Sequence, residues 1–179
     1  LMRSSAASDV YKRQKDGGIN GWLSELAFVP VDFNEGAMAD EWSGDVGVGC
    51  KYFSQDAVIK LAEAGGYRFK EGATPAEKLK EIQALMEKDD PLARQIYEDI
   101  GVYLAYTLPF YAKFYDMKHV LLLGRVTGGK GGNILLDSCK KVLEEEYPEF
   151  AKLDISLPDE KNRRVGQSIA AASLPADRV

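Results

Sequence analysis

The amino-acid sequence predicts an α/β fold in which a mostly parallel sheet is flanked by helices. One observation is the order of patterns in the C-terminal third, where strand, helix, strand and helix alternate. A second is the branched apolar run at residues 120–123, which is typical of a strand covered on both faces. A third is a series of upstream helices with recognisable start signals.

The front of the chain has little helical periodicity. Residues 17–32 form an extended, partly apolar run, and residues 34–49 are rich in glycine and polar residues, as loops are. The first helix is predicted to begin at Ser54, whose hydroxyl can cap it, and to stop at the glycine pair 65–66.

Two further helices have clear start signals. Thr74 and Glu77 form a capping box around Pro75, so a helix is predicted from there to about Lys88. Asp90 then begins a long helix that Pro109 is predicted to kink or break. One apolar stripe of this long helix consists of Ala93, Ile96, Tyr97, Ile100, Tyr103, Leu104, Thr107, Leu108 and Tyr111.

The C-terminal third completes the alternating pattern. The strand at 120–123 leads into a glycine-rich turn and a helix predicted at about 133–147. A short strand is predicted at 153–157 and a last helix at 163–174. This order of elements is the basis for the parallel sheet.

Composition limits the classes of function. The 179 residues are 45% hydrophobic and 28% charged, as in an ordinary soluble globular domain, and the formal net charge is −5. Lysine and arginine are spread along the chain, which argues against a nucleic-acid surface and a polybasic membrane anchor. No apolar run approaches the roughly 20 residues of a membrane-spanning helix. Cys50 and Cys139 lie far apart and are expected to be reduced thiols of a cytoplasmic protein.

Residues 1–14 differ in character from the rest of the chain. They contain no apolar core of the kind a signal peptide needs. The hexapeptide DVYKRQ at 9–14 resembles the in-frame translation of a transposon-end adapter used in sequencing libraries. We therefore expect residues 1–14 to be foreign, the native sequence to begin near Lys15, and the protein's own N-terminus to be missing.

The glycine-rich turn is the strongest functional signal. It lets backbone approach a ligand, and the following helix directs free N–H groups at phosphate or ribose oxygens. A tight connection without a ligand explains the same pattern. Residues 124–131, GRVTGGKG, also fall one residue short of a P-loop, because Gly131 stands where a magnesium-binding hydroxyl is needed. We therefore interpret Lys130 as a solvated loop residue rather than a phosphate clamp.

The alternative is a turn that packs flat against adenosine. The run VLLLGRVTGGKGGNILLD resembles the adenosine segment of the ROK family of sugar kinases and sugar-responsive repressors. NGWLSELAFVPVD resembles the family segment that holds a sugar-binding glutamate, and GDVGVGCKYFSQDAVIKLA resembles the segment that closes the family's zinc motif. Together with the C-terminal AAASL, these segments follow the family's order from Lys15 onward. The resemblance implies the C-terminal lobe of an actin-like ATPase (ribonuclease H-like) fold over residues 15–179, truncated at its front.

The resemblance implies ATP-dependent phosphoryl transfer to a hexose hydroxyl, as in a glucokinase. Glu25 would hydrogen-bond the sugar, and Mg²⁺ would bind the phosphates together with the missing lobe. The catalytic base is expected upstream of Lys15, so the chain alone is expected to be inactive. The residues implied in nucleotide binding are Gly124, Arg125, Val126, Thr127, Gly128 and Gly129.

The sequence departs from the family at the zinc motif. Phe28 stands where the family has a histidine, and Cys50 is the counterpart of one of three zinc cysteines. One thiol cannot complete a four-ligand site, so no structural zinc is expected, and Trp42 is expected to anchor the loop 34–49 by packing. These losses keep a second interpretation open, a sugar-sensing ROK transcriptional regulator without kinase activity, which would bind DNA through an upstream helix-turn-helix. Either interpretation leaves a homodimer open.

Other residues are interpreted as structural. Asp16 precedes two glycines but is taken as a chance neighbour rather than the catalytic aspartate. His119 has no metal-ligand spacing beside it and is expected to be a plain structural or surface histidine. The aromatic residues Tyr103, Tyr106, Phe110, Tyr111, Phe114 and Tyr115 have helical spacing, which favours core packing over base stacking.

Overall fold

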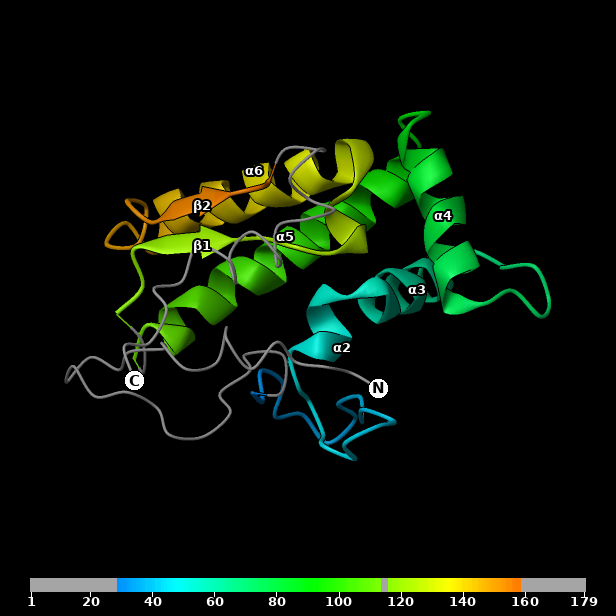
Figure 1. The fold of residues 1–179 in the computed structure, drawn as a ribbon, viewed down its shortest axis with the longest axis horizontal. Coiled ribbons are helices and arrows are strands. Elements are labelled where there is room, and N and C mark those ends of the chain that lie inside the picture. Colours follow the sequence, from blue (N-terminus) through cyan, green and yellow to red (C-terminus); the bar gives the residue numbers. More distant parts are fainter. Residues whose placement is uncertain (1–28, 114–115, 159–179) are drawn as a thin grey trace, which may run out of the picture.

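The computed structural model describes residues 29–113 and 116–158. This part of the chain is mostly helical and contains one parallel pair of strands, which confirms the predicted α/β class (Figure 1). The elements are α2 (Cys50–Phe53), α3 (Gln55–Ala64), α4 (Pro75–Met86), α5 (Pro91–Tyr111), β1 (His119–Leu121), the 3₁₀ turn η2 (Arg125–Thr127), α6 (Gly129–Glu146) and β2 (Asp154–Ser156). The expected foreign segment 1–14 and the expected helix 163–174 lie outside the described residues.

The helices α3, α4 and α5 begin where the sequence predicts. The Ser54 hydroxyl accepts a hydrogen bond from the Asp56 N–H at 3.1 Å, which satisfies a free donor of the first turn of α3. At the start of α4, Thr74 and Glu77 form the reciprocal capping box. The Asp90 carboxylate accepts from two N–H groups of the first turn of α5.

Helix α5 does not break at Pro109. It continues to Tyr111, so the predicted break is absent. Pro109 lies in the last turn, where the missing N–H and the displaced carbonyl disturb only the end of the helix. The carbonyl of Leu108 still accepts the capping hydrogen bond of Ala112 at 2.9 Å.

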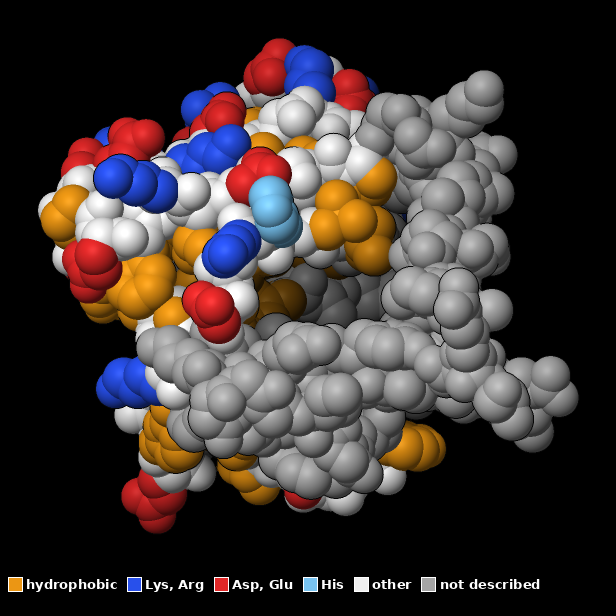
Figure 2. Space-filling view, turned by 60° about the vertical axis from the view of Figure 1, so that its left-hand side comes forward, with side chains coloured by type: hydrophobic (Ala, Val, Ile, Leu, Met, Phe, Trp, Pro, Cys, Tyr) orange, Lys and Arg blue, Asp and Glu red, His pale blue; other side chains and the backbone are white. Residues whose placement is uncertain are grey.

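The strands β1 and β2 pair in parallel, with His119 opposite Asp154 and Leu121 opposite Ser156. Helix α6 connects them, as the strand–helix–strand pattern predicts, but it begins at Gly129, earlier than expected. The expectation of a strand covered on both faces was wrong, because Leu121 and Leu123 are 54% and 43% exposed. Figure 2 shows hydrophobic side chains at the surface on the face of the molecule that carries the histidine.

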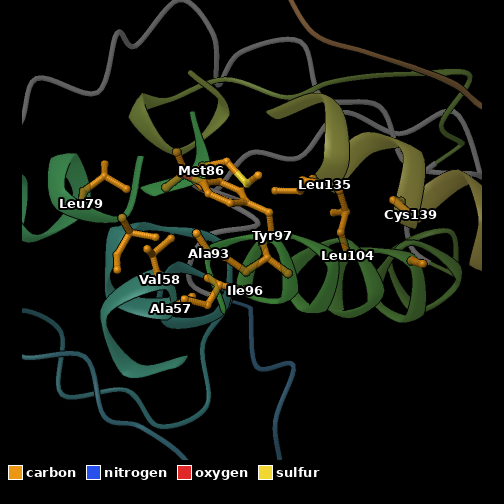
Figure 3. Packing of buried hydrophobic residues seen from close by; sticks show 14 of the residues in the cluster. Ala57, Val58, Leu79, Met86, Ala93, Ile96, Tyr97, Leu104, Leu135 and Cys139 are labelled. Carbon is orange, nitrogen blue, oxygen red and sulfur yellow. The ribbon is translucent and has the colours of Figure 1, made fainter. Parts of the chain in front are cut away.

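The hydrophobic core is centred on α5, which lies along α6 (Figure 1). Tyr97 points from α5 toward Met86 of α4, as Figure 3 shows. Gly101 allows the close approach of the two helices, because a Cβ there would lie 2.4 Å from the carbonyl oxygen of Leu135. The core therefore fixes α4 and α6 on the same central helix.

The loop before α2 contributes carboxylates to a cluster of charges around the buried Lys51, while Trp42 lies at the surface. Trp42 is 74% exposed, so the expectation that it anchors the loop by packing was wrong. Lys51 is 4% exposed, and its ammonium contacts the carboxylates of Asp40, Glu41 and Asp56. Burial alone would lower the pKa of Lys51, but hydrogen bonds to Glu41 and Asp56 raise it above its ordinary value.

The aromatic residues of α5 are only partly in the core. Tyr111 is 4% exposed, whereas Tyr103 and Tyr106 are 37% and 46% exposed, so core packing was the wrong expectation for these two. Together with Phe110 they lie on a second face of α5, against a cavity of about 540 Å³ that Asp32 and its neighbours also line. Phe114 and Tyr115 lie outside the described residues.

Among the described residues, no helix combines the length and the apolar character that crossing a membrane requires.

Candidate functional site

A cavity of about 780 Å³ separates α4 from the glycine-rich turn. One wall is a face of α4, and the other is the backbone of the turn between β1 and α6. The lining residues are Ala76, Leu79, Lys80, Gln83, Ala84 and Glu87 on α4 and its C-terminal cap, and Gly124, Arg125, Gly128 and Gly129 on the turn.

Glycines let the turn fold back on itself. Gly124 has φ 124° and Gly129 has φ 65°, conformations that L-residues rarely adopt. Between them the Thr127 hydroxyl donates to the carbonyl of Gly124 at 2.9 Å. The amide nitrogen of Gln83 donates to the carbonyl of Arg125 at 2.8 Å, which ties the turn to α4 across the cavity.

The structure brings most of the predicted nucleotide-binding residues to this cavity. Gly124, Arg125, Gly128 and Gly129 line it. Val126 is 5% exposed and belongs to the hydrophobic core instead. Thr127 lines a separate apolar cavity of about 480 Å³ between α5 and β1.

A carboxylate of the chain itself occupies the N-terminus of α6. Glu87 Oε1 accepts the backbone N–H of Lys130 at 3.2 Å. The expected free N–H groups at this helix start are therefore partly satisfied within the protein. The positive end of the helix dipole already faces a negative charge.

Lys130 is not a solvated loop residue. It lies in the first turn of α6, and its ammonium contacts both Asp89 oxygens, at 3.0 and 3.1 Å, and the Glu87 carbonyl at 3.1 Å. These contacts join the α4–α5 turn to the start of α6 at one edge of the cavity. Its charge is used by the protein, so Lys130 differs from the free lysine of a P-loop.

Gly131 explains why the turn is not a P-loop. A Cβ at this position would lie 2.4–2.6 Å from ring carbons of Tyr97. A hydroxyl-bearing residue therefore cannot replace Gly131 without displacing that ring. The P-loop interpretation loses its magnesium ligand for a reason of packing.

Tyr97 carries a buried hydroxyl behind this wall. Its oxygen makes no hydrogen bond among the described residues. Burial raises the pKa of Tyr97 to about 12, although the nearby amide of Gln83 acts in the opposite direction.

The predicted sugar-site residues cannot be placed. Glu25, Phe28 and Asp16 lie outside the described residues. Cys50 is described, and burial, with Asp40 beside it, raises the pKa of its thiol to about 11. Within the described ranges, no His, Cys, Asp and Glu side chains form a group that could hold a metal ion.

His119 lies on the surface, as expected for a plain histidine. Its side chain is 79% exposed and its Nδ1 lies 2.9 Å from Asp154 Oδ2 on the neighbouring strand. The pairing of β1 with β2 explains this contact, and it does not involve the cavity.

Sequence reasoning missed the wall formed by α4. Ala76, Lys80, Gln83 and Glu87 recur at spacings of three and four residues, which places them on one face of a helix. This signal was present in the sequence. It does not show, however, that the face lies opposite a turn more than 30 residues downstream.

Comparison with known proteins adds no family assignment, because no family model matches the chain and no curated protein matches it significantly.

Proposed function

We propose that this chain forms the adenosine-binding lobe of an ATP-dependent sugar kinase of the ROK type. The cavity between α4 and the glycine-rich turn carries the proposal. Its volume falls within the roughly 300–1,000 Å³ of small-molecule sites. Three of the four lining residues of the turn are glycines, and the α4 wall carries Ala76, Leu79 and Ala84 beside its polar side chains. A flat purine ring can therefore stack between glycine backbone and the apolar part of α4.

In this proposal the β1–α6–β2 unit belongs to the sheet of an actin-like ATPase lobe. ATP binds with its adenosine in the cavity, Mg²⁺ neutralises the phosphates, and a hexose is held by Glu25. Catalysis then depends on positioning and on charge stabilisation more than on covalent work by the protein.

The second candidate is a sugar-sensing regulator of the same family without kinase activity. The surroundings of Cys50 favour it. The carboxylates beside Cys50 bind the Lys51 ammonium, so a cation of the protein itself stands in the segment that resembles the zinc motif. Loss of the zinc site weakens the sugar site of a kinase and so favours the regulator. A kinase produces ADP when ATP and a hexose are supplied. A regulator binds the sugar without producing ADP. Because this chain alone is expected to lack the catalytic base, a coupled ADP assay of the full-length protein over a panel of hexoses separates the two.

Filling the cavity tests the nucleotide site. Ala84 is exposed on α4 and lines the cavity, so Ala84→Trp adds a large side chain there without entering the core. We expect the affinity for ATP, measured by calorimetry, to fall about tenfold or more, which corresponds to about 1.4 kcal/mol.

Ala64→Trp is the matched control, because Ala64 is an exposed residue at the end of α3, away from the cavity. It should leave ATP affinity unchanged. Equal affinity in the Ala84→Trp and Ala64→Trp variants, or no ATP binding by the unaltered chain, contradicts the proposal.

A further inference from the structure

Glu87 places a carboxylate at the cavity with one oxygen fixed and the other available. Oε1 accepts the Lys130 N–H at 3.2 Å. It also lies so close to Gly129 that a Cβ there would be 2.7 Å away. Within the described part of the chain, Oε2 accepts no hydrogen bond, and Glu87 is an exposed residue of the cavity lining.

The backbone beneath this carboxylate is held in place. Lys130 Nζ donates to the Glu87 carbonyl at 3.1 Å and to the Asp89 carboxylate at 3.0 Å. Asp89 adopts φ 57°, which turns the chain sharply between α4 and α5. The position of Glu87 is therefore set before a ligand arrives, which reduces the ordering that binding requires.

A carboxylate in this position changes which ligand groups the helix start can bind. The N-terminus of a helix ordinarily attracts phosphate, but a negative charge already there repels a second one. An ionised carboxylate only accepts hydrogen bonds, so it needs a partner with donors. The vicinal hydroxyls of ribose are such donors, and their bonds to a charged acceptor are among the stronger ones.

We propose that Glu87 accepts hydrogen bonds from the 2′- and 3′-hydroxyls of a bound nucleoside and directs its phosphates away from the α6 N-terminus. The inference rests on the proposed nucleotide site. It makes Glu87 a specificity-determining residue that selects ribose-containing ligands.

Calorimetry with adenosine and 2′,3′-dideoxyadenosine tests this directly on the full chain of 179 residues. Neither probe carries phosphate, so the ribose hydroxyls are the only difference. We expect adenosine to bind about tenfold more tightly, as hydrogen bonds to a charged group allow. In Glu87→Gln, an amide oxygen can still accept the Lys130 N–H while an amide donor replaces the free oxygen, so the preference should fall to within about threefold. Glu87→Ala should abolish it.

Glu145→Gln is the matched control, since Glu145 is exposed in the last turn of α6, at the opposite end of that helix from Glu87, and lies outside the cavity. It should keep the unaltered preference. Equal binding of the two nucleosides by the unaltered chain overturns the role of Glu87 and leaves the nucleotide site standing. A preference that survives in both Glu87 variants overturns it as well. Failure of the chain to bind either nucleoside removes the proposed function, and the role of Glu87 with it.

Discussion

Gly131 is a position where only a residue without a side chain fits between α5 and α6. The ring of Tyr97 lies against its Cα, at the distance where any side chain would collide. Its neighbour Gly132 is similarly restricted, because a Cβ there would lie 2.2 Å from the carbonyl oxygen of Thr127. The glycines of this segment therefore have packing roles as well as a role in the turn.

Gly131→Ser should destabilise the protein by about 1–3 kcal/mol, the usual cost of overpacking a core. The cost should be smaller when Tyr97 is replaced by Leu, because the colliding ring is then absent. Chemical denaturation of the single and double variants measures this coupling.

Gly36→Ser is the control, because Gly36 has open space around it. It should change the free energy of unfolding by less than about 0.5 kcal/mol. Equal losses from Gly131→Ser and Gly36→Ser would show that the contact with Tyr97 does not constrain position 131.

Individual residue environments were the hardest to predict from the sequence. Lys130 follows a pair of glycines, and nothing in that local pattern shows that Asp89 comes to meet it. Trp42 is apolar and central in its loop, yet it lies at the surface, and a buried lysine contacts the loop's carboxylates. The environment of Lys130 depends on a contact between segments distant in sequence, and that of the loop depends on charge pairs. Hydrophobic periodicity reports neither.

At the scale of elements, residues 29–49 are joined by backbone hydrogen bonds that lie outside any regular helix or strand. Isolated bridges join Pro30 to Val48 and Ala39 to Val46. Gly47 turns with φ 71°, and a Cβ there would collide with the Asp32 carbonyl at 1.8 Å. The Lys51 ammonium supplies the charge that keeps the acidic part of this segment together.

Lys51→Met should release this segment, because the aliphatic part of the side chain is kept while the carboxylates lose their cation. We expect a loss of about 1–3 kcal/mol in the free energy of unfolding and faster proteolysis within residues 34–49.

Lys141→Met on the exposed side of α6 is the comparison for that change, since it removes the same charge without touching the acidic cluster. Its proteolysis should match that of the unaltered chain. Protection of residues 34–49 in Lys51→Met would show that packing alone holds the segment.

The starts of the helices were predictable because their signals are local. A hydroxyl or carboxylate followed by free N–H groups satisfies the same atoms in almost any tertiary context, as at Ser54, Thr74 and Asp90. The exposure of β1 was not predictable in this way. The apolar side chains of Leu121 and Leu123 predict burial, but whether they are buried depends on what covers the second face of the sheet.

At the scale of the whole molecule, one hydrophobic cluster runs through α3, α4, α5, α6 and β2. Helix α5 contributes the largest share, so the positions of α4 and of the glycine-rich turn both depend on it. The cavity between them is a product of this shared packing. The sequence predicts the glycine-rich turn from a local pattern, but the α4 wall opposite it depends on how distant segments pack on α5, which no local pattern shows.

Ile96→Ala should cost about 2–5 kcal/mol, as expected for a side chain that is 1% exposed at the centre of this cluster. Denaturation followed by circular dichroism should show one cooperative transition at a lower midpoint, since a single core unfolds as a unit.

Leu121→Ala is the matched comparison, because Leu121 is 54% exposed on β1. It should cost less than about 1 kcal/mol. Two separate transitions in Ile96→Ala would contradict the picture of one continuous core.

The hydrogen bond between Gln83 and the carbonyl of Arg125 links α4 to the glycine-rich turn across the cavity between them. This bond limits how far the helix and the turn can move apart. In the proposed nucleotide site, an entering base therefore needs no closure of this gap, so its rate of entry should follow diffusion and solvent viscosity more than any hinge movement.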